Sequence, residues 1–396
     1  MRVPVEPGGV ARAGLVTRIV TQEADLERLA PRWNALLDSL SDPSPFQSLE
    51  WIEAWWKAYG AGGSLHILLA EVDDDLLAAV PLAGRKSGPF RILRFLGSPR
   101  SDFVDALVRP GDEDALKAIF SALAGVISEW DVLHFQDLAE GSVLYRILKE
   151  AAPGLDWRLA SRDGSSMPYL SCHRTWNEYL GEQGGHFRKR TRQEGRKLME
   201  LGTLENICVT DPPDSDASLQ VMSAIESRSW KVQARAERLR SPEDRLFMRE
   251  ILARFGPRGW VSLWVFRRQG RPMAHVLLFR YRDRHYAYNT AFDDEIASYS
   301  PGRVLMTRAM EAAFTDGARS FELLRGAHGF KSRWTDTVRT NRDVVVWRSG
   351  IPGAAAAWAI VRARWVAQRS SLVKSLAAKI RSLRGRGGAS NGAASA

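Results

Sequence analysis

The sequence lacks most of the residues and motifs by which enzyme classes are recognised. Only two cysteines, Cys172 and Cys208, occur among 396 residues, and they form neither a CxxC pair nor a cluster with histidine. Such cysteines exclude a disulfide framework and suit a reducing cytoplasm, and we expect no metal site. GxSxG, HExxH, GxxxxGK[ST] and a GxGxxG after a strand are also absent, which leaves common hydrolase, metalloprotease and nucleotide-binding classes without support.

Long apolar stretches are missing as well. No run approaches the roughly 18 apolar residues that a membrane span needs, and residues 1–18 lack the apolar core of a signal peptide. The chain is 45% apolar and 26% charged, which is typical of a soluble globular protein, and it is long enough for two domains. We therefore expect a cytoplasmic protein.

Acidic residues are missing from the end of the chain. None follows Asp343, whereas Arg348–Arg386 contains nine lysines and arginines. Removing these nine charges from the net charge of +10 leaves +1 for residues 1–343. A nearly neutral body gives little support to nucleic-acid binding by the protein as a whole.

The same basic segment is rich in apolar residues. In Ala354–Arg386, tryptophan, leucine, isoleucine and valine are interleaved with arginine and lysine. The pattern predicts a basic amphipathic helix within residues 351–396 that contacts an anionic membrane surface, peripheral to the inner membrane. Lys374, Lys379 and Arg381 would each add about 1 kcal/mol of attraction to lipid headgroups. A helix packed on the protein's own body, or a partly disordered tail, is the alternative.

Residues 15–165 are predicted to alternate between strands and helices. Asp73–Asp75 forms the turn of a hairpin. In an aromatic helix, Trp51 and Trp55 are four residues apart and share a face, which we interpret as core rather than as a sugar-stacking site. The predicted strands are Leu15–Thr21, Leu65–Val72, Leu76–Arg85, Ile92–Leu96, Phe103–Val108, Val132–Gln136 and Trp157–Ser161, and the predicted helices are Glu23–Leu40, Phe46–Tyr59, Asp112–Trp130 and Ser142–Ala152.

Residues 166–350 show a similar order of elements. Three antiparallel strands precede a polar loop, a helix that begins at Pro301 and ends near Gly317, and a short strand. We therefore predict two α/β domains, residues 15–165 and 166–350, followed by residues 351–396. The strands of this half are Val261–Arg267, Pro272–Tyr281, His285–Phe292 and Phe321–Leu324, and its other helices are Trp176–Leu201, interrupted at Gly184-Gly185, Ala217–Val232 and Pro242–Phe255.

Two features of the second half could attract an anion. The helix that begins at Pro301-Gly302 presents free N–H groups and a positive dipole end, which favour a phosphate, and Arg303 would add charge. A plain helix-start turn is the alternative, because one glycine is weak evidence. The helix Trp176–Leu201 forms either a solvated face or a positive wall for an anionic substrate. Its cations are Arg188, Lys189, Arg190, Arg192, Arg196 and Lys197.

The order of these elements resembles the acyl-CoA-binding core of the GNAT acetyltransferases. The segments that carry the resemblance are FQSLEWIEAWW (Phe46–Trp56), HFRKRTRQEGRKLMELG (His186–Gly202), YSPGRVL (Tyr299–Leu305) and ELLRGAHGFKSRW (Glu322–Trp334). They are similar to CelD-like acetyltransferases of bacterial polysaccharide biosynthesis, which are relatives of Fem-type peptidyltransferases. The resemblance covers most of residues 45–335 and implies two tandem GNAT-like α/β domains with mixed, largely antiparallel sheets flanked by helices.

The resemblance also implies where an acyl donor binds. In the GNAT fold, the pantetheine of acetyl-CoA or another acyl-CoA lies along the strand His285–Phe292, whose backbone holds the thioester carbonyl. The helix start that follows anchors the phosphates. The implied cofactor-binding residues are therefore Tyr288, Asn289, Ser300, Pro301, Gly302 and Arg303. The sequence departs from the GNAT phosphate-loop pattern Q/R-x-x-G-x-G/A, of which only Gly302 remains.

Candidate catalytic residues follow the same strand order. Glu322 lies where the two central strands should separate, and we expect it to act as the base or to orient the acceptor, with Lys331 as its ionic partner. A structural ion pair between these residues is the alternative. His275 and His328 are reserve bases, although a lone strand histidine is often a packed core residue. In the segment Gly326–Lys331, Phe330 stands where the family often has tyrosine.

The function predicted from the resemblance is transfer of an acyl group, acetyl in the first instance. The donor is an acyl-CoA, and the acceptor is an amino or hydroxyl group on a sugar or glycolipid-type envelope or polysaccharide precursor in the cleft between the domains. Two alternatives remain. One is a Fem-like aminoacyl transferase that uses charged tRNA, and the other is a non-catalytic scaffold of a polysaccharide-synthesis complex.

Overall fold

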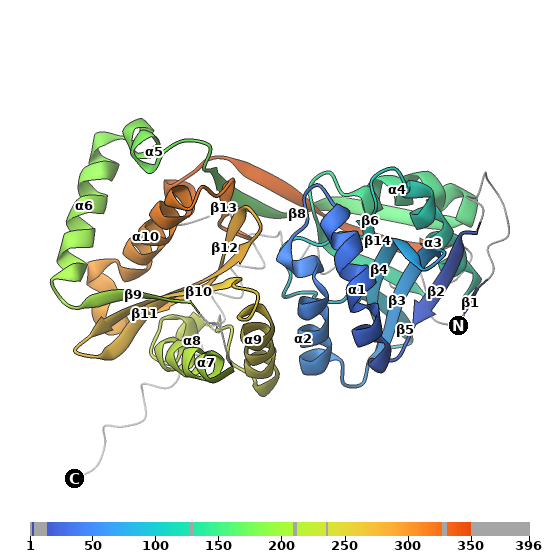
Figure 1. Cartoon of the computed structure of the whole chain (residues 1–396), viewed down its shortest axis with the longest axis horizontal. Helices are drawn as coiled ribbons and strands as arrows, with labels where there is room; N and C mark the ends of the chain where they lie inside the picture. The colour runs from blue at the N-terminus through green and yellow to red at the C-terminus, as the bar shows by residue number, and fades with distance from the viewer. Residues whose placement is uncertain are drawn as a thin grey trace, which may run out of the picture.

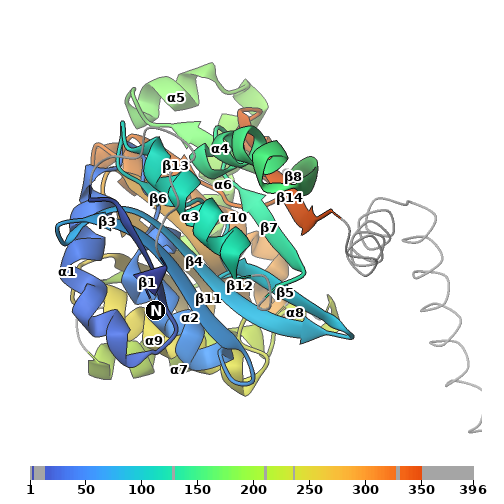
Figure 2. The same cartoon turned by 90° about the vertical axis from the view of Figure 1, so that its right-hand side faces the viewer.

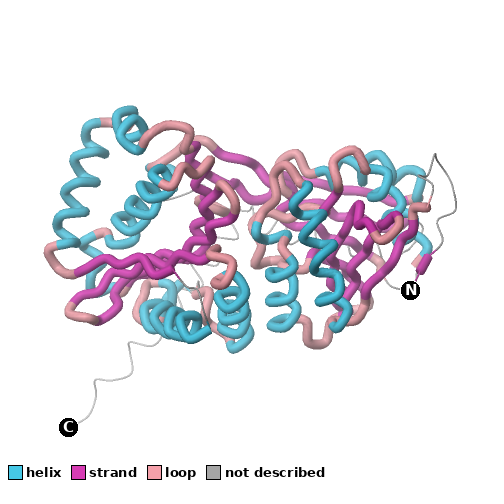
Figure 3. Tube along the Cα trace, in the orientation of Figure 1, coloured by secondary structure: helices cyan, strands magenta, loops and turns pink. Residues whose placement is uncertain are grey.

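The computed structural model describes residues 2–3, 14–126, 130–208, 212–234, 237–326 and 331–349. The protein has two lobes, one built mainly from the first half of the chain and the other mainly from the second (Figure 1). The described strands form one 14-stranded sheet that runs through both lobes. The fold is thus a mixed α/β fold with a large sheet flanked by helices, as predicted (Figure 3). The predicted basic helix lies outside the described residues.

The N-terminal lobe contains a parallel pair of strands within an otherwise antiparallel arrangement. Four strands pair antiparallel in the order β2-β3-β4-β5, and β5 then pairs parallel with β7. Short β1 extends the edge at β2, and β6 pairs with β4. The bounds are β1 (Arg2–Val3), β2 (Val16–Val20), β3 (Ser64–Val72), β4 (Asp75–Ser87), β5 (Phe90–Phe95), β6 (Leu107–Val108) and β7 (Val132–Leu138).

Helices cover both faces of this lobe's sheet. Buried side chains of α1 and α2 belong to one core, and those of α3 and α4 belong to a second core on the opposite face (Figure 2). The helices are α1 (Ala24–Ser39), α2 (Leu49–Tyr59), α3 (Glu113–Gly125) and α4 (Val143–Ala151), with short turns η1 (Pro45–Gln47) and η3 (Ala152–Leu155).

The C-terminal lobe repeats this topology. Four antiparallel strands in the order β9-β10-β11-β12 lead to β13, which pairs parallel with β12. In each lobe a long helix connects the two parallel strands, α3 in the first lobe and α10 in the second. The strands are β9 (Thr203–Cys208), β10 (Val261–Arg268), β11 (Arg271–Tyr281), β12 (Arg284–Phe292) and β13 (Ser320–Glu322).

The helices of the C-terminal lobe also divide between the two faces. Buried residues of α5, α6 and α10 share one core with β11, whereas those of α7 and α9 join the core that reaches into the N-terminal lobe. The helices are α5 (Trp176–Glu182), α6 (Gly185–Met199), α7 (Pro212–Glu226), α8 (Lys231–Ala234), α9 (Pro242–Phe255) and α10 (Pro301–Thr315), with turns η4 (Asp294–Tyr299) and η5 (Lys331–Arg333). Within the described ranges, none of the helices combines the length and apolar character needed to cross a membrane.

Two long strands join the lobes. Strand β8 (Trp157–Ser171) pairs with β14 (Val338–Arg348) through its first part and with β13 through its end. Strand β14 also pairs with β7, so residues from the end of the described chain complete the N-terminal lobe. From the sequence, the strand that begins at Trp157 was predicted to end at Ser161, and no strand equivalent to β14 was predicted. Residue 165, the predicted domain boundary, lies within β8, and the division into two domains stays a prediction.

An aromatic core fills the space between the lobes. Helices α2 and α9 lie side by side across the boundary (Figure 1). Trp51 is fully buried, and its ring lies 5.0 Å from that of Phe247 and 5.6 Å from that of Tyr288. The core interpretation of Trp51 and Trp55 is therefore confirmed, since both are buried. Helix α2, the aromatic helix of the first half, therefore packs against strands β11 and β12 of the C-terminal lobe.

Candidate active site

The two parallel strands of the C-terminal lobe separate at Glu322. Arg284 pairs with Ser320, His285 with Phe321 and Tyr286 with Glu322, and the pairing ends there. Strand β12 continues to Phe292, whereas the chain after β13 turns away at Leu324, which has a positive φ of 61°. The separation predicted from the sequence is present. We call this interruption of the ladder between β12 and β13, whose flanking residues are buried, the opening.

Strand β12 has a bulge inside this opening. Leu277 of β11 pairs with Asn289 and Leu278 with Ala287, so Tyr288 is an extra residue without a partner on β11. A bulge disturbs the regular ladder and redirects the side chains near it. The Tyr288 ring lies 4.4 Å from the guanidinium of Arg238. The predicted thioester position is therefore at an irregular part of the strand, where backbone groups can face a ligand.

Asn289 is held by a buried network of polar side chains. The Lys231 ammonium donates to the Asn289 amide oxygen at 2.7 Å and to Glu226 at 3.0 Å. The Asn289 amide in turn donates to Glu226 at 3.0 Å. This network ties β12, beside the bulge, to the end of α7 and to α8. The Asn289 side chain, predicted to be cofactor-binding, is thus engaged within the protein.

Glu322 is fully buried and pairs with arginine rather than with Lys331. One carboxylate oxygen accepts a hydrogen bond from Arg339 at 2.7 Å, and the other accepts from Ser320 at 2.6 Å. Arg284 lies 3.8 Å away. The predicted Glu322–Lys331 ion pair is wrong, because β14 brings Arg339 beside β13 and sequence spacing could not reveal this neighbour. The arrangement favours the orienting role over the role of base.

Lys331 lies at the opening but binds carbonyl groups. Its ammonium donates to the carbonyl oxygens of Leu324 at 3.2 Å and Arg325 at 2.7 Å. Burial lowers the Lys331 pKa to about 8; the charge of Asp102 opposes this shift, whereas those of Arg238 and Arg325 add to it. The ammonium therefore lies beside the end of β13 and has a pKa of about 8. Of the segment around it, residues 327–330, which include His328 and Phe330, lie outside the described residues.

Asp102 of the N-terminal lobe lies beside the opening. It is fully buried, and one of its oxygens accepts a hydrogen bond from Arg325. Its second oxygen has no hydrogen-bond partner among the described residues. Arg325 also lies 3.6 Å from Asp137. Both lobes thus supply charged groups to the same place, which no local sequence pattern indicated.

Tyr286 is a candidate that sequence reasoning missed. It is fully buried opposite Glu322, at the last paired position of β12. Its hydroxyl makes no hydrogen bond of good geometry within the described ranges, although Arg284 lies close enough to act on its pKa. Burial raises the pKa of this hydroxyl above its ordinary value, so it remains a protonated donor. In the sequence, Tyr286 is distinguished only by its place in the predicted strand His285–Phe292.

A pocket of about 420 Å³ lies between the lobes beside Tyr286. From the C-terminal lobe it is lined by Arg284, Tyr286 and Arg339, the residues that surround Glu322. From the N-terminal lobe it is lined by residues of the loops before α2, α3 and α4, among them Ser44, Phe103 and Asp105. The predicted interdomain cleft therefore has a counterpart that opens onto the end of the parallel strand pair.

His275 is placed where a base has no access to a ligand. It lies in the middle of β11, is fully buried, and neither ring nitrogen has a hydrogen-bond partner among the described residues. Burial, with a contribution from the charge of Lys231, lowers the His275 pKa to about 3. The histidine is thus neutral and enclosed by the sheet and its helices. These observations favour the interpretation of His275 as a packed core residue over its prediction as a reserve base.

A carboxylate occupies the predicted phosphate site. Ser300 has φ of 54° and precedes α10, and its hydroxyl donates to Glu194 of α6 at 3.2 Å. Arg303 forms an ion pair with Glu194 at 3.2 Å and donates to Thr191 at 3.0 Å. The positive end of α10 and the Arg303 charge are therefore neutralised within the protein. Sequence reasoning assigned this charge to a ligand because Glu194 is distant in the chain.

A basic pocket of about 490 Å³ lies beside this helix start. Its wall from α6 includes exposed Lys189, Arg190 and Lys197, and its other wall includes Ser298 and Tyr299 from the turn before α10. Lys189 and Lys197 have no ion-pair partner within the described part of the chain. The predicted positive wall is thus next to the predicted phosphate-binding helix. The structure places Pro301 and Gly302 at that helix start, with Gly302 packed against the ring of Phe292.

The described residues include no group of three or more histidine, cysteine, aspartate or glutamate side chains arranged to hold a metal ion. The groups that surround the opening are the Tyr286 hydroxyl, the Lys331 ammonium, arginine side chains and the backbone of β12.

Comparison with known proteins identifies a GNAT-type acetyltransferase domain in part of the chain. Residues 185–332 match the model of a family described as an acetyltransferase (GNAT) domain. This range contains α6, the bulged strand β12, α10 and β13. No curated protein matches the sequence.

Solved structures share the fold at low sequence identity. The crystal structure of FemX has a TM-score of 0.56 and 11% identity, over 80% of this chain and 95% of that chain. The C-terminal domain of a putative lysylphosphatidylglycerol synthetase from Agrobacterium fabrum has a TM-score of 0.52 and 12% identity, over 86% and 97%. A conserved protein of unknown function from Bacteroides thetaiotaomicron has 0.50 and 9%, over 84% and 100%. The protein is similar to these structures in fold.

Proposed function

We propose that this protein transfers an acyl group, acetyl in the first instance, from acyl-CoA to an amino or hydroxyl group of a sugar or glycolipid-type precursor. The observation that carries the proposal is the separated strand pair. Its bulge at Tyr288 lies on one side, the Tyr286 hydroxyl lies at its base, and the interlobe pocket opens beside it. GNAT domains generally use acetyl-CoA. The CelD-like resemblance supports a polysaccharide or envelope precursor as the acceptor.

The donor would bind from the side of α10. In this arrangement the CoA phosphates lie in the basic pocket between α6 and the start of α10, near Lys189 and Lys197. The pantetheine then runs toward the opening between β12 and β13, and the backbone around Tyr288 and Asn289 binds the thioester carbonyl. Glu194 stays at the helix start as the partner of Arg303, and the phosphates bind beside it.

The reaction needs attack by the acceptor and loss of a thiolate. The acceptor nitrogen or oxygen bonds to the thioester carbon, the carbon–sulfur bond breaks, and the acceptor gives up one proton to solvent water. The same solvent returns a proton to Tyr286 after its hydroxyl has protonated the leaving sulfur. The Tyr286 hydroxyl is the group that donates a proton to the leaving sulfur, and the Lys331 ammonium stabilises negative charge on the carbonyl oxygen. Glu322 acts as a positioning residue, since it holds Arg284 and Arg339 at the acceptor pocket.

A second donor class has support from one observation. Arg192 and Arg196 on α6 are exposed and have no ion-pair partner among the described residues, yet they lie outside the basic pocket. A cationic surface wider than the pocket suits a polyanion such as charged tRNA, the donor of the Fem-like alternative. Acyl-CoA should need only the α6 cations that line the basic pocket, whereas charged tRNA should also need Arg192 and Arg196.

Charge reversal on α6 separates these donors. We expect Lys189→Glu with Lys197→Glu to weaken acetyl-CoA binding by about tenfold or more, because both side chains line the basic pocket. Arg192→Glu with Arg196→Glu is the matched control on the same helix. Equilibrium titration with acetyl-CoA and with charged tRNA checks the result. If the unchanged protein shows no measurable acetyl-CoA binding and both double variants lose tRNA binding, the donor is charged tRNA and not acyl-CoA.

The Lys331 ammonium predicts a pH dependence. Its pKa is lowered to about 8, so the charged form is present below that pH and is lost as pH rises through about 8. We expect the ratio of kcat/KM for the unchanged protein to that of Lys331→Arg to fall over this range, because arginine stays protonated. Rate profiles from about pH 6 to about pH 10 measure the ratio, in which titration of the acceptor cancels. A constant ratio would show that Lys331 charge is not used.

A further inference from the structure

Arg325 connects the two lobes immediately after β13. Its guanidinium donates to the buried Asp102 carboxylate and to the carbonyl oxygen of Ser101, both in the loop after β5. It also lies 3.6 Å from the carboxylate of Asp137 in β7. Hydrogen bonds to an ionised carboxylate are roughly twice as strong as those between neutral groups. One arginine of the C-terminal lobe is thus held by two acidic residues of the N-terminal lobe.

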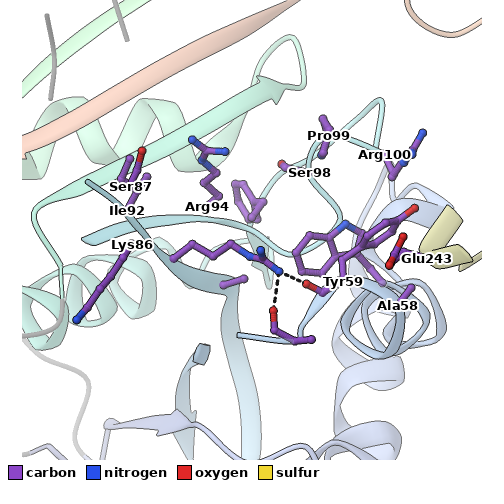
Figure 4. A pocket seen from close by; sticks show the side chains of 15 residues that line it. Ala58, Tyr59, Lys86, Ser87, Ile92, Arg94, Ser98, Pro99, Arg100 and Glu243 are labelled. Carbon is purple, nitrogen blue, oxygen red and sulfur yellow. Dashed lines mark hydrogen bonds between the residues drawn. The ribbon is translucent and has the colours of Figure 1, made fainter. Parts of the chain in front are cut away.

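The loop after β5 holds Asp102 in a fixed place. Its residues Ser98–Arg100, labelled in Figure 4, border a cavity of about 630 Å³ beside α2. Arg100 pairs with Asp244 of α9. At Asp102 itself, the Asn341 amide of β14 donates to the backbone carbonyl oxygen at 2.6 Å. Asp102 is therefore anchored by contacts to elements outside its own loop.

The backbone next to Arg325 binds Lys331. The Lys331 ammonium donates to the carbonyl oxygens of Leu324 at 3.2 Å and Arg325 at 2.7 Å. Leu324 has φ of 61°, a left-handed conformation that leucine adopts only where surrounding contacts fix it. One such contact is the hydrogen bond from the Gly326 N–H to β8 at 2.8 Å, and another is the pairing of Arg325 with Asp102. Both carbonyl groups that bind Lys331 are therefore fixed in part from the N-terminal lobe.

Charges from both lobes act on the Lys331 ammonium. Burial is the main cause that lowers the Lys331 pKa to about 8, and the positive charges of Arg238, between α8 and α9, and of Arg325 lower it further. The negative charge of Asp102 acts in the opposite direction and favours the protonated amine. Of the described charged groups that act on Lys331, only Asp102 is acidic. The protonation of a C-terminal lysine therefore depends on a carboxylate from the other lobe.

We propose that Asp102, acting through Arg325, is a positioning residue for Lys331. It fixes the two carbonyl groups that bind the ammonium, and its charge favours the ammonium beside the end of β13. The N-terminal lobe thereby completes the group that stabilises negative charge on the thioester carbonyl. This catalytic consequence rests on the proposed acyltransferase function, whereas the contact from Asp102 through Arg325 to Lys331 does not.

Titration of Lys331 in the full chain, without acyl donor or acceptor, tests the proposal. The measured signal is the NMR resonance of the Lys331 Cε in isotope-labelled protein, assigned by its absence from Lys331→Arg. Asp102→Asn removes the carboxylate charge but keeps an oxygen for Arg325, and it should lower the Lys331 pKa by about 0.5 or more. Arg325→Gln removes a positive charge but keeps a donor for Asp102, and it should raise the Lys331 pKa. Loosening of the turn alone would expose Lys331 to water and raise its pKa in both variants, so the opposite directions separate the proposed role from a purely structural contact.

A double variant keeps the test decisive if a single variant does not fold. Loss of one partner of a buried ion pair costs stability, so thermal unfolding of each variant accompanies the titration. Asp102→Asn with Arg325→Gln removes one charge of each sign. Its Lys331 pKa should lie below that of Arg325→Gln, because the two proteins differ only in the Asp102 charge.

Glu53→Gln is the matched control. Glu53 of α2 pairs with Arg254 of α9 across the same lobe boundary, and neither charge is among those that act on Lys331. The Lys331 pKa should be unchanged in this variant. The proposal is overturned if removal of the Asp102 charge, alone or together with Arg325→Gln, leaves the Lys331 pKa unchanged or raises it, or if Glu53→Gln has the same effect as Asp102→Asn.

The catalytic consequence has a separate readout. In pH profiles of kcat/KM, the limb that Lys331→Arg removes should move in Asp102→Asn in the same direction as the NMR pKa. A limb that stays in place while the NMR pKa moves would refute the catalytic consequence. The NMR shifts in a protein that shows no acyl transfer would retain the contact and refute the enzyme.

Discussion

Replacement of Tyr286 by phenylalanine should reduce kcat about 100-fold while leaving the protein at least as stable as before. The hydroxyl is buried at the base of the strand separation and makes no hydrogen bond of good geometry among the described residues. A buried, unpaired hydroxyl costs stability, so its removal should not destabilise the fold. Its retention in a buried position is explained if a ligand supplies the partner. In the proposed reaction that partner is the leaving sulfur.

Tyr179→Phe is the matched control for this experiment. Its hydroxyl is equally buried but donates to the carbonyl oxygen of Trp334 at 2.8 Å, on the far side of α10. We expect this variant to lose about 1 kcal/mol of unfolding free energy and to keep its kcat. Denaturant unfolding and single-turnover kinetics measure the two quantities. An unchanged kcat in Tyr286→Phe would remove the hydroxyl from the mechanism.

The second large effect concerns stability. Glu322→Ala should lower the free energy of unfolding by about 3–5 kcal/mol, because it leaves the partly buried Arg339 guanidinium without its ion-pair partner. Arg284 keeps its ion pair with Asp42. The carboxylate is fully enclosed and bonded to both Arg339 and Ser320. The two arginines also line the acceptor pocket, so the loss should extend to acceptor binding.

Glu322→Gln distinguishes structure from chemistry at this position. It keeps the shape and an oxygen acceptor, so the loss of unfolding free energy should be smaller than that of Glu322→Ala. If Glu322 positions the arginines, the glutamine variant should raise KM for the acceptor more than it lowers kcat. A large loss of kcat at unchanged KM would instead make Glu322 a catalytic base. Denaturant unfolding with steady-state kinetics gives all three values.

Elements with strong local signals could be predicted from the sequence. Helix α9 begins at Pro242 after the Ser241 capping box and ends at Phe255, the predicted bounds. The bounds of β10, β11 and β12 differ from those predicted by no more than one residue, because alternation and short polar turns fix them. Strand β14 was not predicted. Its polar residues Arg339–Asp343 interrupt the apolar pattern, and its partners β7 and β8 lie far back in the chain.

For the site as well, features that depend on one segment of the chain could be predicted, whereas contacts between remote segments could not. The position of the strand separation, the start of α10 and the basic face of α6 could be predicted, because each depends on one segment. The pairing of Glu322 with Arg339, and of Glu194 with Ser300 and Arg303, could not, because each joins elements that are remote in sequence. Tyr286 was missed for a related reason. An aromatic residue in an alternating strand looks like core until the neighbours of its hydroxyl are known.

Thermal unfolding of the full chain with and without acetyl-CoA tests the central claim most directly. A donor site at α10 and the strand separation predicts that acetyl-CoA at about 100 times its dissociation constant adds roughly 2.7 kcal/mol, a rise in Tm of a few degrees. The rise should be smaller in Lys189→Glu with Lys197→Glu. No rise with any acyl-CoA would contradict the acyl-CoA-dependent account and leave charged tRNA as the donor to test.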